Sequence, residues 1–566
     1  MHRSKRVAAL WVGLLFGVFS AAGWAQGPSA GDLRRSGTVR LEVTCKPELQ
    51  EDFRSAVALL HSFFYEEARR RFQELSERDP ECAMAWWGIA MTHYHPLWAP
   101  PTPEELVAGT AAVQTAKRIG GKTDLERGLI DAIDAYFRSD DEQAVTGPAA
   151  QSCHGPRAHG ARAQAFRERL EALGEEFPDH LEVAIFHALA LLGTAQPTDK
   201  TYGNQLAATA ILEPLFERNP DHPGIPHYII HAYDYAPLAA RGLIAARRYD
   251  DIAPWVPHAL HMPSHIYTRL GMWTDSIEAN LASAGAARDY AARFFGAAAT
   301  MDELHALDYL MFAYLQTEQD RKAGELWQRI QKLEKLQEIN FASAYAIGAI
   351  PARYTLERRR WEEAAELPLP YPEKMTAYPY AVAHVEFARA LGGARSGRLE
   401  TTRQAIARLE ELREQLKEPK FQWWTTQVEI QRLAAAGWLA FAEGHAQEAE
   451  RLLREAVELE SQAGTHPVTP GQILPAREQL ADLLLELNRP REALAAYETS
   501  LEEFPNRFNG HFGAGRAAEL AGEREAARRH YSALLEMAAS GDGRRAELEI
   551  ARKFEATAAI DAGPSR

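Results

Sequence analysis

The sequence lacks the short motifs that identify many common enzyme classes. It contains no H-E-x-x-H, no P-loop, no G-x-S-x-G and no dinucleotide-binding fingerprint, so it gives the corresponding hydrolytic and nucleotide chemistries no direct support. It also has no basic stripe, and the formal net charge is −15. An acidic chain of this kind argues against nucleic acid and against anionic membrane surfaces as partners.

Long apolar runs are confined to the first 25 residues. Arg3, Lys5 and Arg6 precede an apolar stretch at 7–20, and Gly23 to Ala25 form a plausible small-residue cleavage site. This pattern predicts a secretory signal peptide over 1–25, and an uncleaved membrane anchor is the alternative. We expect no membrane span after cleavage, and a mature protein that is periplasmic or secreted from a bacterium.

Cysteine is scarce, with Cys45, Cys82 and Cys153 as the only three. Disulfides form outside the cytosol, so an exported chain can use them. Cys45 with Cys82 is the plausible pair, and the odd count leaves one cysteine over. Cys153 lies in a loop rich in Gly, Pro, Ser and Asp, where an exposed thiol is the simplest interpretation.

Most of the chain has the composition and periodicity of helices. Ala, Leu, Glu and Arg dominate, with apolar residues three and four apart. Only Thr38 to Thr44 alternates apolar and polar residues, which allows one short strand. The 566 residues exceed what one compact core usually supports, but a repeat array escapes that limit because each repeat needs only its neighbours.

Histidine is concentrated between Pro226 and Asn280. His227 and His231 form an H-x3-H pair, and His261 and His265 repeat it 34 residues later. Residues four apart lie on one helical face, one turn apart. A period of about 34 residues is typical of helix-turn-helix repeats. The spacing therefore predicts an imidazole-lined patch within a helical solenoid.

Several segments share the pattern aromatic, Ala, aromatic or apolar, Pro. The chain resembles the tetratricopeptide-repeat family in these segments, and phrases such as HSFFYEEA (61–68) and HMPSHI (261–266) resemble a group of predicted secreted bacterial tetratricopeptide proteins without assigned activity. The resemblance implies an all-α solenoid, a right-handed superhelix, that binds through a concave groove. The matching residues are Tyr65, Ala68, Phe72, Leu75 and Pro80, then Leu487, Ala493, Tyr497 and Pro505, then Gly522, Ala527 and Tyr531.

These observations predict five segments along the chain. They are a signal peptide (1–25), an N-terminal extension (26–46), a tetratricopeptide-like α-solenoid with a His-lined groove (47–400), C-terminal repeats (401–545) and a disordered tail (546–566).

The resemblance also implies which residues line the groove. Pro263 falls inside a groove helix, where it should interrupt the helix and place His258 on a separate short turn. The groove residues are expected to be His227, His231, Asp234, His258, His261, His265, His305 and Asp308, with His61, His95 and Arg353 at further groove positions and Tyr233 and Tyr267 beside the histidines.

Imidazole is the commonest protein metal ligand, so a metal site is one interpretation of this patch. His227, His231, His261 and His265 would form a four-nitrogen site for zinc or, with Met262 and Met272 near, for copper. Asp234, His305 or Asp308 would be a fifth ligand or an orienting group. The alternative is that the histidines only pack, bonded to Tyr233, Tyr267 or backbone.

Three functions remain open from the sequence. The first is an exported interaction scaffold that binds a protein or peptide in its groove. The second is a metal-binding protein for storage or delivery, and the third is a metal-dependent enzyme that uses the same cluster. In the enzyme, an acid such as Asp302 near His305 would be a general base, although a first-turn acid at a helix start is the simpler interpretation.

Overall fold

The computed structural model describes residues 36–97, 100–138, 157–196, 199–337, 339–418, 421–464, 466 and 468–561, without the side chains of 157, 158 and 558–561. The expected signal peptide and Cys153 lie outside these residues. Within them every named element is a helix, and the one β-type pairing is an isolated bridge between Ala299 and Leu336. The all-α prediction is confirmed.

The segment Thr38–Thr44 is extended but does not form the strand that the alternation allowed. Its backbone N–H groups bond to parts of distant helices instead of to a neighbouring strand. Arg40 N–H donates to Glu182 at 3.0 Å and Thr44 N–H to Glu126 at 2.6 Å. Just after it, Cys45 and Cys82 form a disulfide with a Cα–Cα distance of 4.8 Å, as the sequence suggested.

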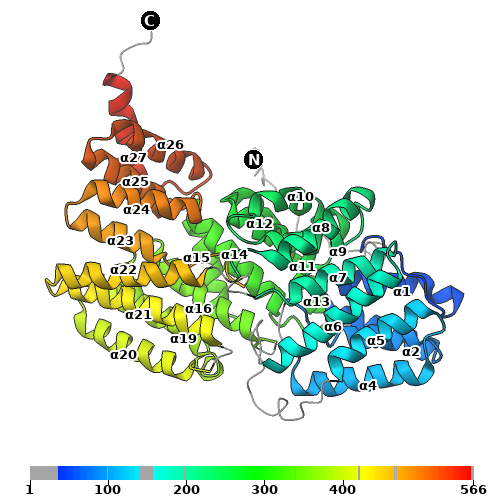
Figure 1. Ribbon diagram of the computed structural model, residues 1–566. Helices are drawn as coiled ribbons and strands as arrows, with labels where there is room; N and C mark the ends of the chain where they lie inside the picture. The colour runs from blue at the N-terminus through cyan, green and yellow to red at the C-terminus, as the bar shows by residue number, and fades with distance from the viewer. Residues whose placement is uncertain are drawn as a thin grey trace, which may run out of the picture.

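The N-terminal half consists of antiparallel helix pairs built around one hydrophobic core that runs from Val39 to Tyr267 (Figure 1). The helices before the histidine-rich stretch are η2 (Pro47–Leu49), α1 (Gln50–His61), α2 (Tyr65–Arg78), α3 (Ala83–Met91), α4 (Pro103–Ile119), α5 (Asp124–Phe137), α6 (Arg157–Glu176), α7 (Leu181–Gly193), α8 (Gly203–Arg218) and α9 (Gly224–Tyr233).

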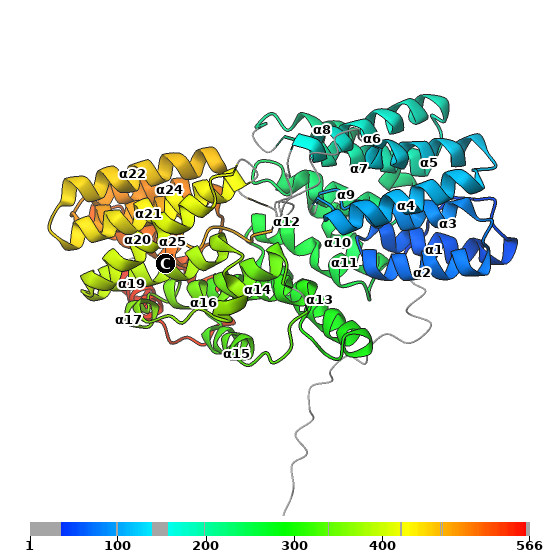
Figure 2. The same ribbon diagram turned by 90° about the horizontal axis from the view of Figure 1, so that it is seen from below.

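The middle of the chain joins this core to a second core that runs from Trp273 to Ala551. Figure 2 shows α12 to α14 between the two halves of the molecule. The helices here are η4 (Ala239–Gly242), α10 (Leu243–Ile252), α11 (Pro257–His261), α12 (Pro263–Arg269), α13 (Trp273–Phe294), α14 (Met301–Gln316), α15 (Asp320–Gln331), α16 (Phe341–Leu356), α17 (Trp361–Ala365) and α18 (Pro372–Met375).

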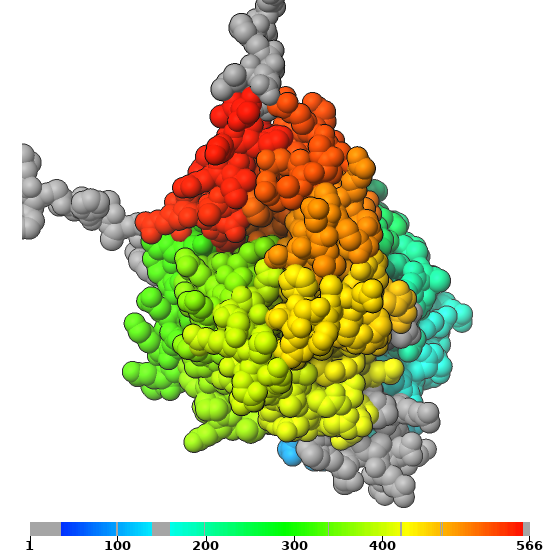
Figure 3. Space-filling model, turned by 90° about the vertical axis from the view of Figure 1, so that its left-hand side faces the viewer, coloured from blue at the N-terminus to red at the C-terminus, as the bar shows by residue number. Residues whose placement is uncertain are grey.

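The C-terminal half stacks its helix pairs in chain order, as the continuous run of colours on the face in Figure 3 shows. Leu548 and Ala551 are fully buried, so the last helix packs on the core where the sequence predicted a disordered tail. The helices are α19 (Pro379–Ser396), α20 (Leu399–Gln415), α21 (Gln422–Ala442), α22 (Ala446–Ala463), α23 (Ala476–Glu486), α24 (Pro490–Glu503), α25 (Phe508–Ala521), α26 (Arg524–Met537) and α27 (Ala546–Asp561).

Candidate metal centre

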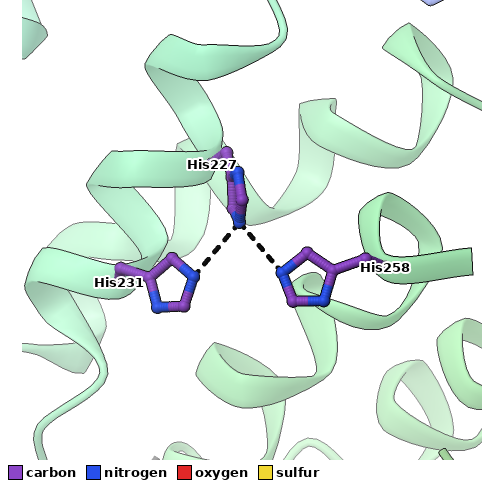
Figure 4. Close-up of side chains that lie close together, drawn as sticks. All are labelled: His227, His231 and His258. Carbon is purple, nitrogen blue, oxygen red and sulfur yellow. Dashed lines mark hydrogen bonds between the residues drawn. The ribbon is translucent and has the colours of Figure 1, made fainter. Parts of the chain in front are cut away.

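Three histidines from two helices meet at one point and form what we call group A. His227 and His231 lie one turn apart on α9, and His258 lies on α11. The Nε2 atom of His227 is 3.1 Å from Nε2 of His231 and 3.1 Å from Nε2 of His258, so His227 stands between the other two (Figure 4). His227 is fully buried and His258 nearly so.

A second set of three histidines, group B, follows directly. His261 ends α11, His265 lies on α12 and His305 on α14. The Nε2 atoms of His261 and His265 are 3.0 Å apart, and the ring centroids of His261 and His305 are 4.4 Å apart. All three side chains are buried. In each group, one nitrogen from every ring lies within 4.8 Å of the others.

The two groups are neighbours at the junction of the two cores. The ring centroids of His258 and His261 are 6.5 Å apart, and those of His231 and His265 are 6.4 Å apart. Group A is carried by helices that belong to the N-terminal core, while α14, which carries His305, belongs to the C-terminal core. The six rings therefore lie where the halves of the molecule meet.

Several rings are held by acceptors at the nitrogen that faces away from the cluster. Nδ1 of His227 lies 2.6 Å from the carbonyl of His61, and Nδ1 of His261 lies 2.6 Å from Oδ1 of Asn280. The amide of Asn280 is oriented by its own bond from Nδ2 to the carbonyl of Ser276. An oxygen of this kind can only accept, so Nδ1 carries the hydrogen and Nε2 turns a lone pair towards the cluster.

His265 is oriented in the same way by a carboxylate. Its Nδ1 lies 2.8 Å from Oδ2 of Asp234, whose Oδ1 accepts from Nε of Arg269 at 2.9 Å. Burial opposes ionisation of Asp234, but Arg269 and His265 hold its pKa below the usual value. Asp234 thus lies behind His265 and orients it, which was one of the two roles the sequence left open.

The surroundings keep five of the six imidazoles neutral. Burial is the largest cause, and neighbouring imidazoles add to it. Together they lower the pKa of His231 and of His305 to about 3. The same two causes lower the pKa of His227, His258 and His261 well below the usual value. Neutral imidazole is the form that binds metal ions.

The grouping differs from the four-nitrogen site that the repeat spacing predicted. His227 and His231 fall in group A, while His261 and His265 fall in group B. The reason is the helix break that Pro263 was expected to cause: α11 ends at His261 and α12 begins at Pro263. Each H-x3-H pair therefore gains its third histidine from a following helix, and His258 and His305 are the residues gained.

Asp308 and Arg353 do not join the histidines. They form a fully buried ion pair, with Nε of Arg353 3.1 Å from Oδ1 of Asp308. Arg353 also donates to the carbonyls of Gly471 and Gln472, both at 2.8 Å. The pair ties α14 and α16 to the loop before α23. Neither the predicted ligand role of Asp308 nor the predicted groove position of Arg353 agrees with this arrangement.

The other predicted residues have separate surroundings. The hydroxyl of Tyr233 donates to Glu213, and Tyr267 lies close to the charges of Asp250 and Asp275. His61 bonds to Glu182 and Tyr228 and supports group A only through its carbonyl. His95 packs on Tyr65 and lines a cavity that also reaches His258.

Three aromatic residues beside the histidines were missed by the sequence analysis. Phe63 packs on all three rings of group A, with a centroid distance of 4.4 Å to His227. Tyr249 stacks on the other side of His227 at 5.2 Å. Tyr309 packs on all three rings of group B. Only Tyr309 had a detectable signal, because it follows His305 by one helical turn.

The fold defines a helical-repeat protein with a buried histidine cluster between its halves. Residues 51–95 and 478–542 match the family model of the tetratricopeptide repeat. These two stretches thus carry the tetratricopeptide repeat that the resemblance implied. These repeats are the basis for expecting a protein-interaction scaffold.

Two solved structures illustrate the likeness in architecture. A human IFIT1 dimer with m7Gppp-AAAA is 14% identical with a TM-score of 0.36, over 81% of this chain and 90% of that one. Yeast Tom70 is 11% identical with a TM-score of 0.31, over 88% of this chain and 91% of that one. No curated protein matches the chain. At these scores the RNA bound by the human protein carries no argument about this one.

The part of the chain that the structure describes contains no helix long and apolar enough to cross a membrane.

Proposed function

We propose that groups A and B each bind one metal ion and together form a dinuclear centre. The observation that carries the proposal is the pair His261 and His265. His261 donates its Nδ1 hydrogen to Asn280, and His265 donates its Nδ1 hydrogen to Asp234. The Nε2 atoms of the two rings then face each other at 3.0 Å, each with a lone pair when its ring is neutral. While both rings are neutral, no hydrogen bond between them satisfies that arrangement, whereas a cation between them binds both lone pairs.

Copper suits this centre better than zinc. Imidazole nitrogen binds both, and copper stands highest in the general affinity order of divalent ions. The nearest carboxylate, Asp234, is already paired with Arg269, so almost no negative charge offsets a buried cation. A buried site of neutral ligands favours the ion of lowest charge, which is monovalent copper. Three protein ligands also leave a position open on each ion, as in catalytic sites.

Metal content after copper loading and desalting tests the proposal. We expect about two equivalents per chain for the unchanged protein, and about one each for His258→Ala and His305→Ala, because each change removes one of three ligands. His530→Ala is the matched control. His530 also faces another imidazole, with Nδ1 3.2 Å from Nδ1 of His511, but Nε2 has Glu498 as a partner, so this variant should keep both ions. Copper content below about 0.2 equivalents in the unchanged protein would reject the centre. Preferential retention of zinc would reject the choice of metal.

A second function is favoured by the match to the repeat family, and we propose it as a property of the outer surface. The histidines are too deeply buried to meet a peptide, so a protein partner would use exposed repeat residues. The pocket of Arg489, Arg491 and Leu520 in the C-terminal repeats is the candidate, and Leu520 is 50% exposed. Leu520→Glu should abolish binding of a partner cross-linked to the exported protein while copper content stays unchanged. If the Leu520→Glu variant still binds the partner, the partner contacts a different part of the surface.

Export is part of the same proposal. The disulfide between Cys45 and Cys82 is compatible with an oxidising compartment. Fractionation of cells that produce the full chain should place it outside the cytoplasm with 1–25 removed. A full-length cytoplasmic chain would contradict export.

A further inference from the structure

A cavity of about 390 Å³ opens beside group A and includes His258 in its wall. Its lining comes from the start of α2, the segment before α4, the start of α11, the end of α13 and the start of α14. His258 therefore contacts both sites: its Nε2 lies against His227 in group A, and the residue also lines the cavity. A molecule in the cavity would lie next to the metal ion proposed for group A.

The walls of this cavity are unusually rich in aromatic rings. Phe63 stacks on Tyr65 with a centroid distance of 5.3 Å and lies 5.6 Å from the ring of His258. Phe64 and Tyr290 also line the cavity and meet edge-on at 4.7 Å. Phe295 and Phe341 complete the lining. Flat walls of this kind favour a planar, apolar ligand that can stack between them.

The charges in the cavity favour a cation. Three carboxyl groups line it, from Glu66, Glu105 and Asp302, against the single guanidinium of Arg69. Arg69 is held in place by two bonds to Thr92, at 3.1 Å to Oγ1 and 2.8 Å to the carbonyl. Asp302 has lost most of its hydration: burial, and then the charge of Glu66, raises its pKa to about 7. An ammonium group would offset this excess of acid.

We propose that the cavity binds a small aromatic amine, with its ring between the aromatic walls, its ammonium group near Asp302 and its other end beside His258. Asp302 lies on α14 three residues before His305, and Phe63 packs directly on His258. The ligand thus lies against two of the four helices that bring histidines to the centre, α11 and α14. This inference rests on the proposed function only for the contact with metal, since the cavity itself requires none.

Binding to the metal-free protein tests the ligand class. The probes are tyramine and 4-hydroxyphenylacetate, which share a phenol ring and differ in the sign of their charge, and the readout is calorimetric titration. We expect tyramine to bind at least about tenfold more tightly than the acid, a difference of about 1.4 kcal/mol. Equal affinities, or tighter binding of the acid, would overturn the proposal.

Asp302→Asn should remove the preference for tyramine and leave weak binding of the acid unchanged, because the ring contacts remain. Asp124→Asn is the matched control, since Asp124 is also a first-turn acid but lies exposed on α5, away from the cavity. It should behave as the unchanged protein does. A preference that survives Asp302→Asn would overturn the proposed place of the ammonium group.

Copper-loaded protein separates this inference from the dinuclear centre. Tyramine should perturb the electron paramagnetic resonance spectrum of oxidised copper at group A in the His305→Ala variant, which keeps group A alone. Selective binding of tyramine without bound copper would leave the cavity proposal standing and reject the metal centre. Two bound copper ions with no selectivity for the amine would support the metal centre and reject the cavity proposal.

Discussion

Two buried histidine clusters in this molecule have opposite bonding patterns. In the first, His61 and His222 each donate from Nε2 to a different oxygen of Glu182, at 2.9 and 3.0 Å. The remaining nitrogen of His61 accepts from Tyr228, and that of His222 accepts from the N–H of Gly224. Every ring nitrogen thus has a partner of the opposite kind, and no ion is needed to complete the set.

In the second cluster, groups A and B, nitrogen faces nitrogen. For His227, His261 and His265, the carbonyl of His61, Asn280 and Asp234 respectively lie behind the rings and accept from Nδ1. The set of His61, Glu182 and His222, like group A and group B, has three donor groups within 4.8 Å of one another and is largely buried. Distance and burial therefore do not separate a structural cluster from a candidate metal centre, whereas the complementarity of donors and acceptors does.

The largest expected effect comes from breaking the structural cluster. Glu182→Ala leaves His61 and His222 without their shared acceptor, and removing one partner from a buried charged network typically costs about 3–5 kcal/mol. Denaturant unfolding should show this loss, while the folded fraction still binds about two copper equivalents. Loss of copper without loss of stability would reverse the roles assigned to the two clusters.

Removing the metal should come next in size. A ligand at about ten times its dissociation constant stabilises the native state by about 1.4 kcal/mol, so stripping two copper ions with a chelator should cost about 3 kcal/mol and lower the unfolding midpoint by several degrees. The double variant His231→Ala/His265→Ala should show no shift between loaded and stripped samples. A double variant that binds copper normally but unfolds at a much lower temperature would make the histidines packing residues.

A smaller effect is expected behind the ligands. Asp234→Asn weakens the acceptor that orients His265, and changes of this kind typically lower metal affinity by about 10- to 100-fold. Asp308→Asn is the matched control, because Asp308 is also a buried carboxylate paired with an arginine but has Arg353 as its partner. Competition with a chelator should show weaker binding at group B for the first variant only. Equal loss in both would indicate a general structural effect.

The same contrast shows what sequence could and could not reveal. The helical repeats and the break at Pro263 follow from local rules of periodicity and backbone geometry, and the structure agrees with both. The H-x3-H spacing located four of the six clustered histidines, and the repeat alignment named the other two, His258 and His305. The division of the histidines into groups A and B could not be predicted from the sequence. It depends on the angle between α11 and α12 at Pro263, and on the position of α14 between the two cores.

Other residues depended on long-range packing that periodicity does not encode. Glu182 meets His61 across 121 positions of chain, so nothing in either local segment announced their network. The sequence position of Asp308 suited a metal ligand, yet its carboxylate is paired with Arg353. Arg353 in turn donates to the loop at 471–472. Phe63 had no signal at all, because its contact with group A comes from the turn after α1.

The smallest effect concerns a carboxyl group that, among the residues that the structure describes, accepts hydrogen bonds from one N–H. Glu460 accepts from the N–H of Ala476 at 3.0 and 3.1 Å, and burial raises its pKa to about 8. Its pKa in the unfolded chain is near the ordinary value of 4.5, so ionisation penalises the folded state increasingly from about pH 5 to about pH 8 and fully above that. Glu460→Gln keeps an oxygen acceptor and cannot ionise. Its unfolding midpoint should match that of the unchanged protein at about pH 5 and exceed it by a few degrees at about pH 9. If the variant instead had a lower unfolding midpoint than the unchanged protein by the same amount at both pH values, the ionised carboxylate of Glu460 would make a stabilising contact, as that of Glu182 does.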